Sequence, residues 1–105
     1  MYILEIKQNA SAGTTESSDI MITIGKNSGQ GIQIELDSSV EKQFGRQIRE
    51  KIQETLNHLS VTNAKVQAID KGALDCTIQA RTVAAVYRAA NEENVDWQVL
   101  NTWNV

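Results

Sequence analysis

Histidine and cysteine, two side chains that often act as catalytic bases, nucleophiles and zinc ligands, are scarce in this chain. There is one histidine, His58, and one cysteine, Cys76, so a metal site built from His and Cys ligands is not expected. A catalytic dyad of these two residues is poorly supported, because His58 falls at the expected end of a helix and Cys76 lies on an apolar stripe typical of a packed thiol. Gly29–Gly31 lacks the residues of a phosphate-binding loop and the spacing of a dinucleotide fingerprint, so we interpret it as a turn.

A serine in a hydroxyl-rich loop, such as Ser17, is most often a solvated loop residue, but its hydroxyl could also be a site of covalent modification. The small residues Ala10–Gly13 lead into it, and such a segment could be drawn into the active site of a modifying enzyme. Glu16 and Asp19 add negative charge beside it. Ser18 is a second hydroxyl one position away, and the residues alone do not choose between the two serines.

Length and composition predict one soluble domain. The chain has 105 residues, 41% hydrophobic and 22% charged, which suffices for a modest core. The net charge of -3 gives no basic surface for nucleic acid or an anionic membrane. The N-terminus does not have the pattern of a signal peptide, and no apolar run approaches the roughly 20 residues that span a bilayer. A single cysteine is compatible with a reducing compartment, so we expect a cytoplasmic protein.

Two segments alternate between apolar and polar residues, at 20–24 and at 32–36, and each predicts a strand with one buried face. The intervening Lys26–Gly31 is rich in turn residues. We therefore expect these strands to form an antiparallel hairpin. Tyr2, Leu4 and Ile6 also alternate and are compatible with an extra N-terminal edge strand, whereas Asn9–Ser18 has no apolar periodicity and is expected to be irregular.

A helix is expected to follow the second strand. Ser38 with Glu41 three residues later is typical of a capping box. Gly45 is unusual inside a helix, because glycine costs about 1 kcal/mol there relative to alanine, so we expect something to pack close to the backbone at that point. His58 suits the negative end of the helix dipole. The apolar row that predicts this helix consists of Val40, Phe44, Ile48, Ile52, Leu56 and Leu59.

The second half of the chain predicts a third strand at 61–70, which ends in the turn Asp70–Gly72. The segment 74–90 is favoured as one helix by its alanines, but a short strand to Ile78 followed by a shorter helix is also compatible with the pattern. The expected fold is α+β, with a small antiparallel or mixed sheet and two helices on one face, in the order strand–strand–helix–strand–helix. Residues 91–105 form a tail that contains Trp97 and Trp103.

Three segments together resemble a known family. They are Gly13-Thr14-Thr15-Glu16-Ser17-Ser18-Asp19, Ser38-Ser39-Val40-Glu41-Lys42-Gln43-Phe44-Gly45 and Asp70-Lys71-Gly72-Ala73-Leu74-Asp75-Cys76. In order and spacing they are similar to the acyl carrier (gamma) subunit family of bacterial citrate lyase, and the resemblance extends from about Gln8 to Ala89. Ser18 stands where family members often carry glycine, which stiffens the turn.

The resemblance implies that Ser17 is esterified to 2'-(5''-phosphoribosyl)-3'-dephospho-CoA. The chain would then be a single acyl-carrier domain over 1–105, with a flexible segment at 1–18 that holds the attachment loop. It would carry acetyl and citryl groups between an alpha (transferase) and a beta (lyase) subunit, during cleavage of citrate to acetate and oxaloacetate. Its further partners would be a prosthetic-group transferase and an acetyl ligase. The chain itself would be non-catalytic.

Two alternatives remain open. The chain could be the carrier subunit of a citramalate lyase or a malonate decarboxylase, because acyl specificity would reside in the partner subunits. It could also be a non-catalytic interaction module, for which Trp97 and Trp103 offer contact residues. We further hypothesise that Gly45 and Asp70–Gly72 lie near Ser17.

Overall fold

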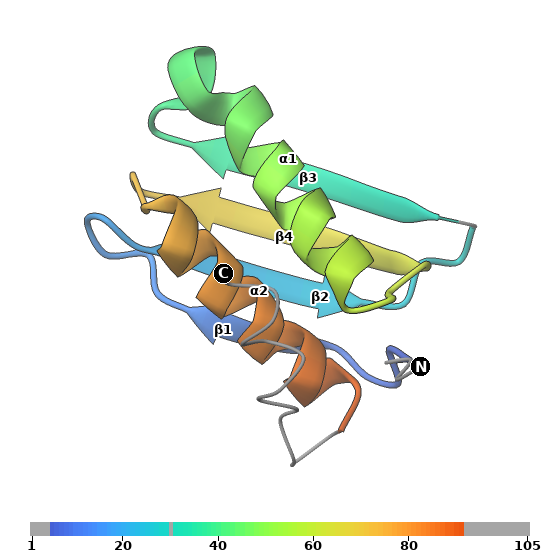
Figure 1. Ribbon diagram of the computed structural model, residues 1–105. Coiled ribbons are helices and arrows are strands. Elements are labelled where there is room, and N and C mark those ends of the chain that lie inside the picture. The colour runs from blue at the N-terminus through green and yellow to red at the C-terminus, as the bar shows by residue number, and fades with distance from the viewer. Residues whose placement is uncertain (1–4, 30, 92–105) are drawn as a thin grey trace.

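The computed structural model describes residues 5–29 and 31–91, which form one mixed sheet covered by two helices (Figure 1). The sheet order is β1-β2-β4-β3, and both helices pack on the same face. This arrangement confirms the two-layer α+β prediction. The elements in chain order are β1 (Ala10–Gly13), β2 (Ile20–Gly25), β3 (Ile32–Ser38), α1 (Glu41–His58), β4 (Ala64–Asp70) and α2 (Asp75–Ala89).

The core lies between the sheet and the helices. Side chains of β2 and β4 alternate between buried and more exposed positions, as expected for strands with one face against a helical layer. Ile22 is paired with Ala68 in the antiparallel register of these two central strands. The predicted alternation is therefore confirmed in both strands. The core residues with no exposed surface include Ile20, Ile22, Ile24, Ala64, Val66, Ile52, Leu56, Ala85 and Val86.

The predicted hairpin of β2 and β3 is wrong, because β4 lies between them. β4 pairs antiparallel with β2 and parallel with β3. The connection Lys26–Gly31 is long enough to pass over one strand, which requires two inter-strand spacings of roughly 4.8 Å each. α1 then returns the chain to the end of the sheet at which β3 begins, so that β4 can run parallel to β3.

The start of α1 also differs from the predicted capping box. The N-cap residue is Val40, and it makes no side-chain cap hydrogen bond. The Ser38 hydroxyl instead accepts a hydrogen bond from the Val40 backbone N–H at 3.1 Å and donates one to Asp70 Oδ2 at 2.8 Å. Glu41 pairs with Arg49 Nη2 at 2.6 Å. The Ser38 hydroxyl thus keeps a local donor, the Val40 N–H in place of the expected Glu41 N–H, and adds a long-range acceptor on the neighbouring strand.

Gly45 is buried, and the groups that lie over it come from its own helix. A Cβ there would lie 2.8 Å from Glu41 Cγ and 3.3 Å from Arg49 Nη1. The glycine thus leaves room for the Glu41–Arg49 pair to cross the helix surface, which agrees with the expected close packing.

Phe44 departs from the predicted apolar row of α1. Its relative exposure is 46%, whereas Ile48, Ile52, Leu56 and Leu59 are buried. The first turn of α1 therefore presents a large aromatic side chain outside the core.

β1 occupies the first part of the segment that was expected to be irregular. Ala10–Gly13 pairs antiparallel with β2, beginning with Ala10 opposite Ile24. The strand is short and its residues are small, so the segment has little of the apolar alternation on which strand prediction depends. In the proposed N-terminal edge strand, Ile6 is buried but lies outside any strand, and Tyr2 and Leu4 lie outside the described residues.

α2 confirms the single-helix interpretation of the last segment. Cys76 lies in the first turn of α2 and is exposed, so the prediction of a packed thiol was wrong. The helix places this side chain on the solvent side, whereas an alternating strand would have placed it on the same face as Ile78. No helix among residues 5–29 and 31–91 is long and apolar enough to cross a membrane. The tail with Trp97 and Trp103 lies outside the described residues.

Candidate functional site

Three chain connections gather at one end of the sheet, on the left in Figure 1. They are the β1–β2 connection at 14–19, the β3–α1 connection at 39–40 and the β4–α2 connection at 71–74. Ser17 lies in the first of them. Each of the three segments that resemble the carrier family contributes to this end.

Ser17 occupies the tip of a tight turn. The Asp19 N–H donates to the Glu16 carbonyl oxygen at 3.2 Å, so residues 16–19 form a β-turn with Ser17 in its second position. Ser17 is exposed, and its hydroxyl has no hydrogen-bond partner within the described part of the chain. Ser18, in the third position, has a φ of 65°. A positive φ at this position alone is the pattern of a type II turn, which favours glycine there.

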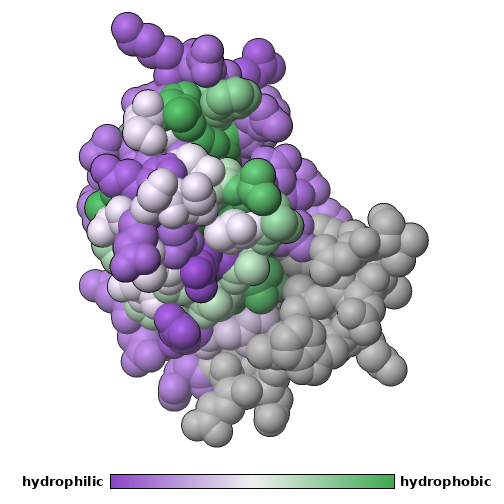
Figure 2. Space-filling model, turned by 90° about the vertical axis from the view of Figure 1, so that its left-hand side faces the viewer, coloured by the Kyte–Doolittle hydropathy of each residue, from purple (hydrophilic) through white to green (hydrophobic). Residues whose placement is uncertain are grey.

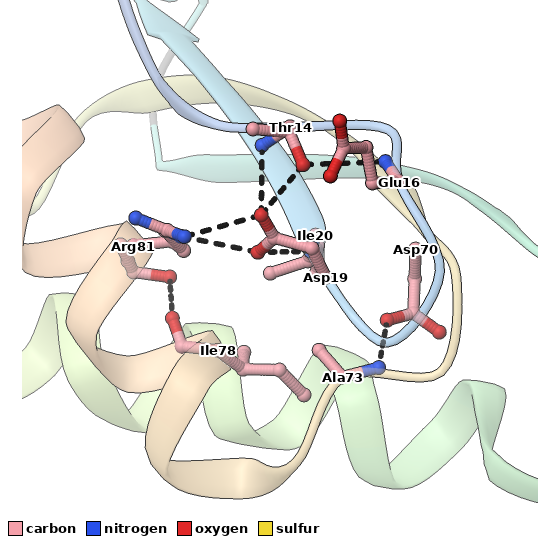
Figure 3. Close-up of polar contacts among 9 residues, drawn as sticks. Thr14, Glu16, Asp19, Ile20, Asp70, Ala73, Ile78 and Arg81 are labelled. Carbon is pink, nitrogen blue, oxygen red and sulfur yellow. Dashed lines mark hydrogen bonds and ion pairs between the residues drawn. The ribbon is translucent and has the colours of Figure 1, made fainter.

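The Asp19 carboxylate organises the loop from its base (Figure 3). It accepts hydrogen bonds from the Thr14 hydroxyl at 2.7 Å and from the Ile20 N–H at 2.7 Å. Arg81 of α2 reaches the same carboxylate with Nε and Nη2, each at 3.1 Å. The Glu16 N–H in turn donates to Thr14 Oγ1 at 3.2 Å. The two ends of the loop are thus fixed to each other and to α2.

These contacts stabilise the charged form of Asp19. The hydrogen bonds from Thr14 and then from Arg81 lower the pKa of the Asp19 carboxyl far below its ordinary value, with the Ile20 N–H adding to the effect. The carboxylate is therefore ionised at any physiological pH.

Gly13 allows β1 to turn sharply into the loop. It has a φ of 96°, and a Cβ at this position would collide with the carbonyl oxygen of Ile20. Only glycine satisfies both conditions without displacing the backbone. The first residue of the family-like motif is therefore explained by the close approach of β1 and β2.

The β4–α2 connection is built around Asp70, whose relative exposure is 1%. Its carboxylate accepts hydrogen bonds from the N–H groups of Gly72 at 3.1 Å and Ala73 at 3.0 Å, in addition to the Ser38 hydroxyl. The structure thus leaves no buried polar side-chain atom without a partner in the described residues. Asp70 joins the ends of two parallel strands to the start of α2.

Lys71 links this connection to the Ser17 loop. The Ser18 N–H donates to the Lys71 carbonyl oxygen at 2.8 Å, and the Lys71 N–H donates to the Asp19 carbonyl oxygen at 2.9 Å. The hypothesis that Asp70–Gly72 lies near Ser17 is therefore confirmed. Gly45 makes no contact with this loop that the structure records; its close neighbours are Glu41 and Arg49.

The geometry offers no catalytic constellation in the parts of the chain it describes. No cluster of three or more His, Cys, Asp or Glu side chains that could hold a metal occurs there. His58 ends α1 at one end of the sheet, while Cys76 begins α2 at the other (Figure 1), so the two cannot form a dyad. The Ser17 hydroxyl is exposed on a turn whose base is held by the Asp19 hydrogen bonds.

Sequence reasoning missed Arg81 and Lys71 as residues that shape the loop. Arg81 falls outside the three family-like segments, and its partner Asp19 is 62 positions away. Lys71 acts through its backbone, which no side-chain pattern reports. A signal of position was available for Asp19, Asp70 and Lys71, since all three belong to the quoted segments, but none was available for the backbone contacts of Lys71.

Comparison with known proteins agrees with this picture. Residues 7–89 match the family described as malonate decarboxylase delta subunit (MdcD). Among solved structures, a chain of a Pseudomonas malonate decarboxylase hetero-tetramer in complex with malonate gives a TM-score of 0.64 at 13% identity, over 84% of this chain and 90% of that one. A homoserine kinase from Cytophaga hutchinsonii gives a TM-score of 0.60 at 10% identity, over 96% of this chain and 41% of that one. At these identities the two structures show the fold alone.

Sequence relatives are much closer. The chain is 62% identical over 101 residues to the citrate lyase acyl carrier protein of Streptococcus equi subsp. zooepidemicus, which covers 96% of this chain and 99% of the relative. It is also 62% identical over 102 residues to the protein of that name from Streptococcus pyogenes, over 97% and 100% of the two chains. The chain therefore belongs to the citrate lyase acyl carrier protein family.

Proposed function

We propose that this chain is the acyl carrier subunit of a citrate lyase and that Ser17 bears 2'-(5''-phosphoribosyl)-3'-dephospho-CoA. The observation that supports it most strongly is the 62% identity to citrate lyase acyl carrier proteins over nearly the whole chain. When bound, the group supplies a thiol on a long arm, which can carry acyl groups as thioesters. The chain would act in the cytoplasm beside alpha and beta subunits, after loading by a prosthetic-group transferase and an acetyl ligase.

The role of the protein part follows from the loop. Ser17 is exposed at the tip of the turn, so a modifying enzyme can approach its hydroxyl without unfolding the domain. Asp19, Arg81 and Thr14 hold the base of the loop, which keeps the attachment point rigid while the arm moves. Tethering turns diffusion between two active sites into a local search, for which an effective concentration on the order of millimolar is typical.

Modification of Ser17 can be tested by mass spectrometry of protein purified from its native host. Trypsin should release the peptide Gln8–Lys26, and we expect it to carry the mass of the nucleotide arm. Ser17→Ala should abolish the added mass and lyase activity of the assembled complex, and methyl and amide NMR spectra should show that the domain stays folded. An unmodified peptide from an actively citrate-cleaving complex would overturn the proposal.

Ser18→Ala is the matched control, because it removes the neighbouring hydroxyl from the same turn. It should keep the arm and the activity. If Ser18→Ala loses the arm and Ser17→Ala keeps it, the attachment point is Ser18 instead.

A second candidate is the carrier of a malonate decarboxylase. What supports it is that the matching family model takes its description from that enzyme. Activity assays of the assembled complex with each substrate separate the two candidates. Cleavage of citrate supports the first candidate, and decarboxylation of malonate supports the second. Citramalate belongs in the same assay as a third substrate.

A further inference from the structure

An apolar groove opens between the first turns of α1 and α2, beside the Ser17 loop. Its volume is about 550 Å³, within the range of small-molecule sites. Phe44 and Leu74, which are 46% and 71% exposed, stand on its rim. Figure 2 looks at this end of the molecule and shows hydrophobic side chains gathered among polar ones. The apolar residues that line it are Val40, Phe44, Ile48, Ala73, Leu74 and Ile78.

The groove is adjacent to the proposed attachment point. Gly72 lines it and directly follows Lys71, whose carbonyl oxygen accepts the Ser18 N–H at 2.8 Å. The covalent bonds and the one hydrogen bond on this path limit the distance between the Cα atoms of Ser17 and Gly72 to about 10 Å at most. A long flexible group on Ser17 therefore starts its path at the edge of the groove.

The charge of the lining restricts what can occupy the groove. Among the described residues, its lining contains no lysine or arginine, and the carboxylate of Asp75 is the one ionisable side chain. Phosphate groups would be repelled and left without a cationic partner. An occupant should instead be uncharged and largely apolar, with at most a few amide or thiol groups.

We propose that this groove holds the uncharged pantetheine stretch of the arm on Ser17, whenever no partner subunit holds the arm. The inference rests on the proposed attachment to Ser17. Pantetheine consists of methylenes, amides and a thiol, which matches the lining, while the nucleotide and its phosphates stay outside. An unoccupied groove would leave Phe44 and Leu74 in water, so covering it removes apolar surface.

The tether makes weak binding sufficient. With an effective concentration on the order of millimolar, an intrinsic dissociation constant of about 1 mM, or about -4 kcal/mol, fills roughly half of the grooves. Such an arm is sheltered for part of the time and still released quickly to a partner.

Methyl NMR of the purified carrier alone provides the test, because it needs no partner subunit and no turnover. In arm-bearing protein, compared with bare Ser17→Ala protein, we expect shifts at the methyl groups of Ile48 and Ile78. Ile24, at the far end of β2, should not shift. Leu74→Asp places a charge on an exposed rim position and should abolish the shifts, whereas Thr62→Asp, an exposed position beyond α1, should leave them.

A second readout is the reactivity of the arm's thiol. Cys76 is itself exposed, so the measurement is made in Cys76→Ser protein. Alkylation by iodoacetamide should be about twofold slower with the native groove than with Leu74→Asp, if half of the arms are sheltered.

Intact mass separates the two levels of the proposal. If the mass shows no arm, the proposed function fails before the groove is tested. If the arm is present and neither the methyl shifts nor the alkylation rates depend on Leu74, the groove does not hold the arm, and the apolar surface belongs to a partner subunit instead.

Discussion

Arg81 of α2 and Asp19 of the β1–β2 loop form a two-point ion pair across 62 residues of sequence, with Nε and Nη2 each 3.1 Å from a carboxylate oxygen. The guanidinium fork matches the carboxylate geometry, which is the strong form of this interaction. The Asp19 side chain is only 14% exposed, so solvent screens it incompletely. The pair attaches the β1–β2 loop, which carries Ser17, to the helical layer of the fold.

The lowered pKa of Asp19 gives a testable pH dependence of stability. Because the folded pKa lies below the ordinary value of 3.8, the stabilisation is fully present above that value and is lost progressively as the pH falls from it through the folded pKa. The difference in unfolding free energy between wild type and Asp19→Asn should therefore be constant from pH 7 to about pH 5 and shrink below about pH 4.

Urea denaturation at pH 7, 5, 4 and 3 measures this difference. Asp37→Asn is the control, since it removes one negative charge from an exposed position of β3 without touching the loop. A difference for Asp19→Asn that stays the same between pH 7 and pH 3 would contradict the role assigned to its hydrogen bonds.

Asp70 should contribute more to stability than other carboxylates of the chain. Asp70→Ala removes a buried carboxylate, and the part-buried hydrogen bonds from the N–H groups of Gly72 and Ala73 lose their acceptor. Orphaned buried donors cost about 1–3 kcal/mol each, so we expect a loss of about 2 kcal/mol or more in the free energy of unfolding. Asp37→Ala should change it by no more than about 0.5 kcal/mol.

The same change should loosen the Ser17 loop. Amide hydrogen exchange of Ser18 and Lys71 reports the two hydrogen bonds that join the loops, and both should exchange faster in Asp70→Ala. If their protection stays at the wild-type level while global stability drops, Asp70 supports the fold without positioning the loop.

Apolar periodicity, with a strand period in β2 and β4 and a helical period in most of α1, predicted these elements, because their inward positions contact one continuous core. Strand pairing could not be predicted in the same way. The pattern of β3 is equally compatible with an antiparallel hairpin, and only the packing of α1 and β4 decides for a parallel neighbour. β1 was missed because Ala-Ser-Ala-Gly contains almost no large apolar residue.

The predicted local contacts failed where a long-range partner competed. Ser38 was expected to cap α1, but its hydroxyl accepts the N–H of the N-cap residue Val40 and donates to Asp70 on the adjacent strand. Glu41, the expected second member of the capping box, pairs with Arg49 instead. The residue types of Ser38 and Glu41 indicated that both make polar contacts at the start of α1. The hydrogen bond between Ser38 and Asp70 could not be predicted, because the two residues are far apart in the sequence.

Ser17 was selected by family resemblance, and the structure adds a physical reason for the motif around it. Gly13 is required by the approach of β1 to β2, and Asp19 by the hydrogen bonds at the loop base. The attachment itself remains a prediction, because it depends on an enzyme that acts on the loop rather than on the loop alone.

Ser18 offers a stability test of the turn. Its φ of 65° costs an L-residue about 1–2 kcal/mol, while glycine adds about 0.5–1 kcal/mol of unfolded-chain entropy. Ser18→Gly should therefore stabilise the domain by about 0.5–1 kcal/mol, which is a rise of roughly 2–6 °C in Tm for a domain of this size.

Ser17→Gly is the matched control, since it changes the adjacent residue of the same turn, where φ is not positive. It gains nothing from relief of strain and should destabilise by about 0.5–1 kcal/mol. Thermal denaturation of both variants tests whether the positive φ at Ser18 is strained. Equal decreases in Tm for the two variants would show that it is not. Opposite signs would show that the serine here stores strain in the turn that presents Ser17, and that the glycine common in the family relieves it.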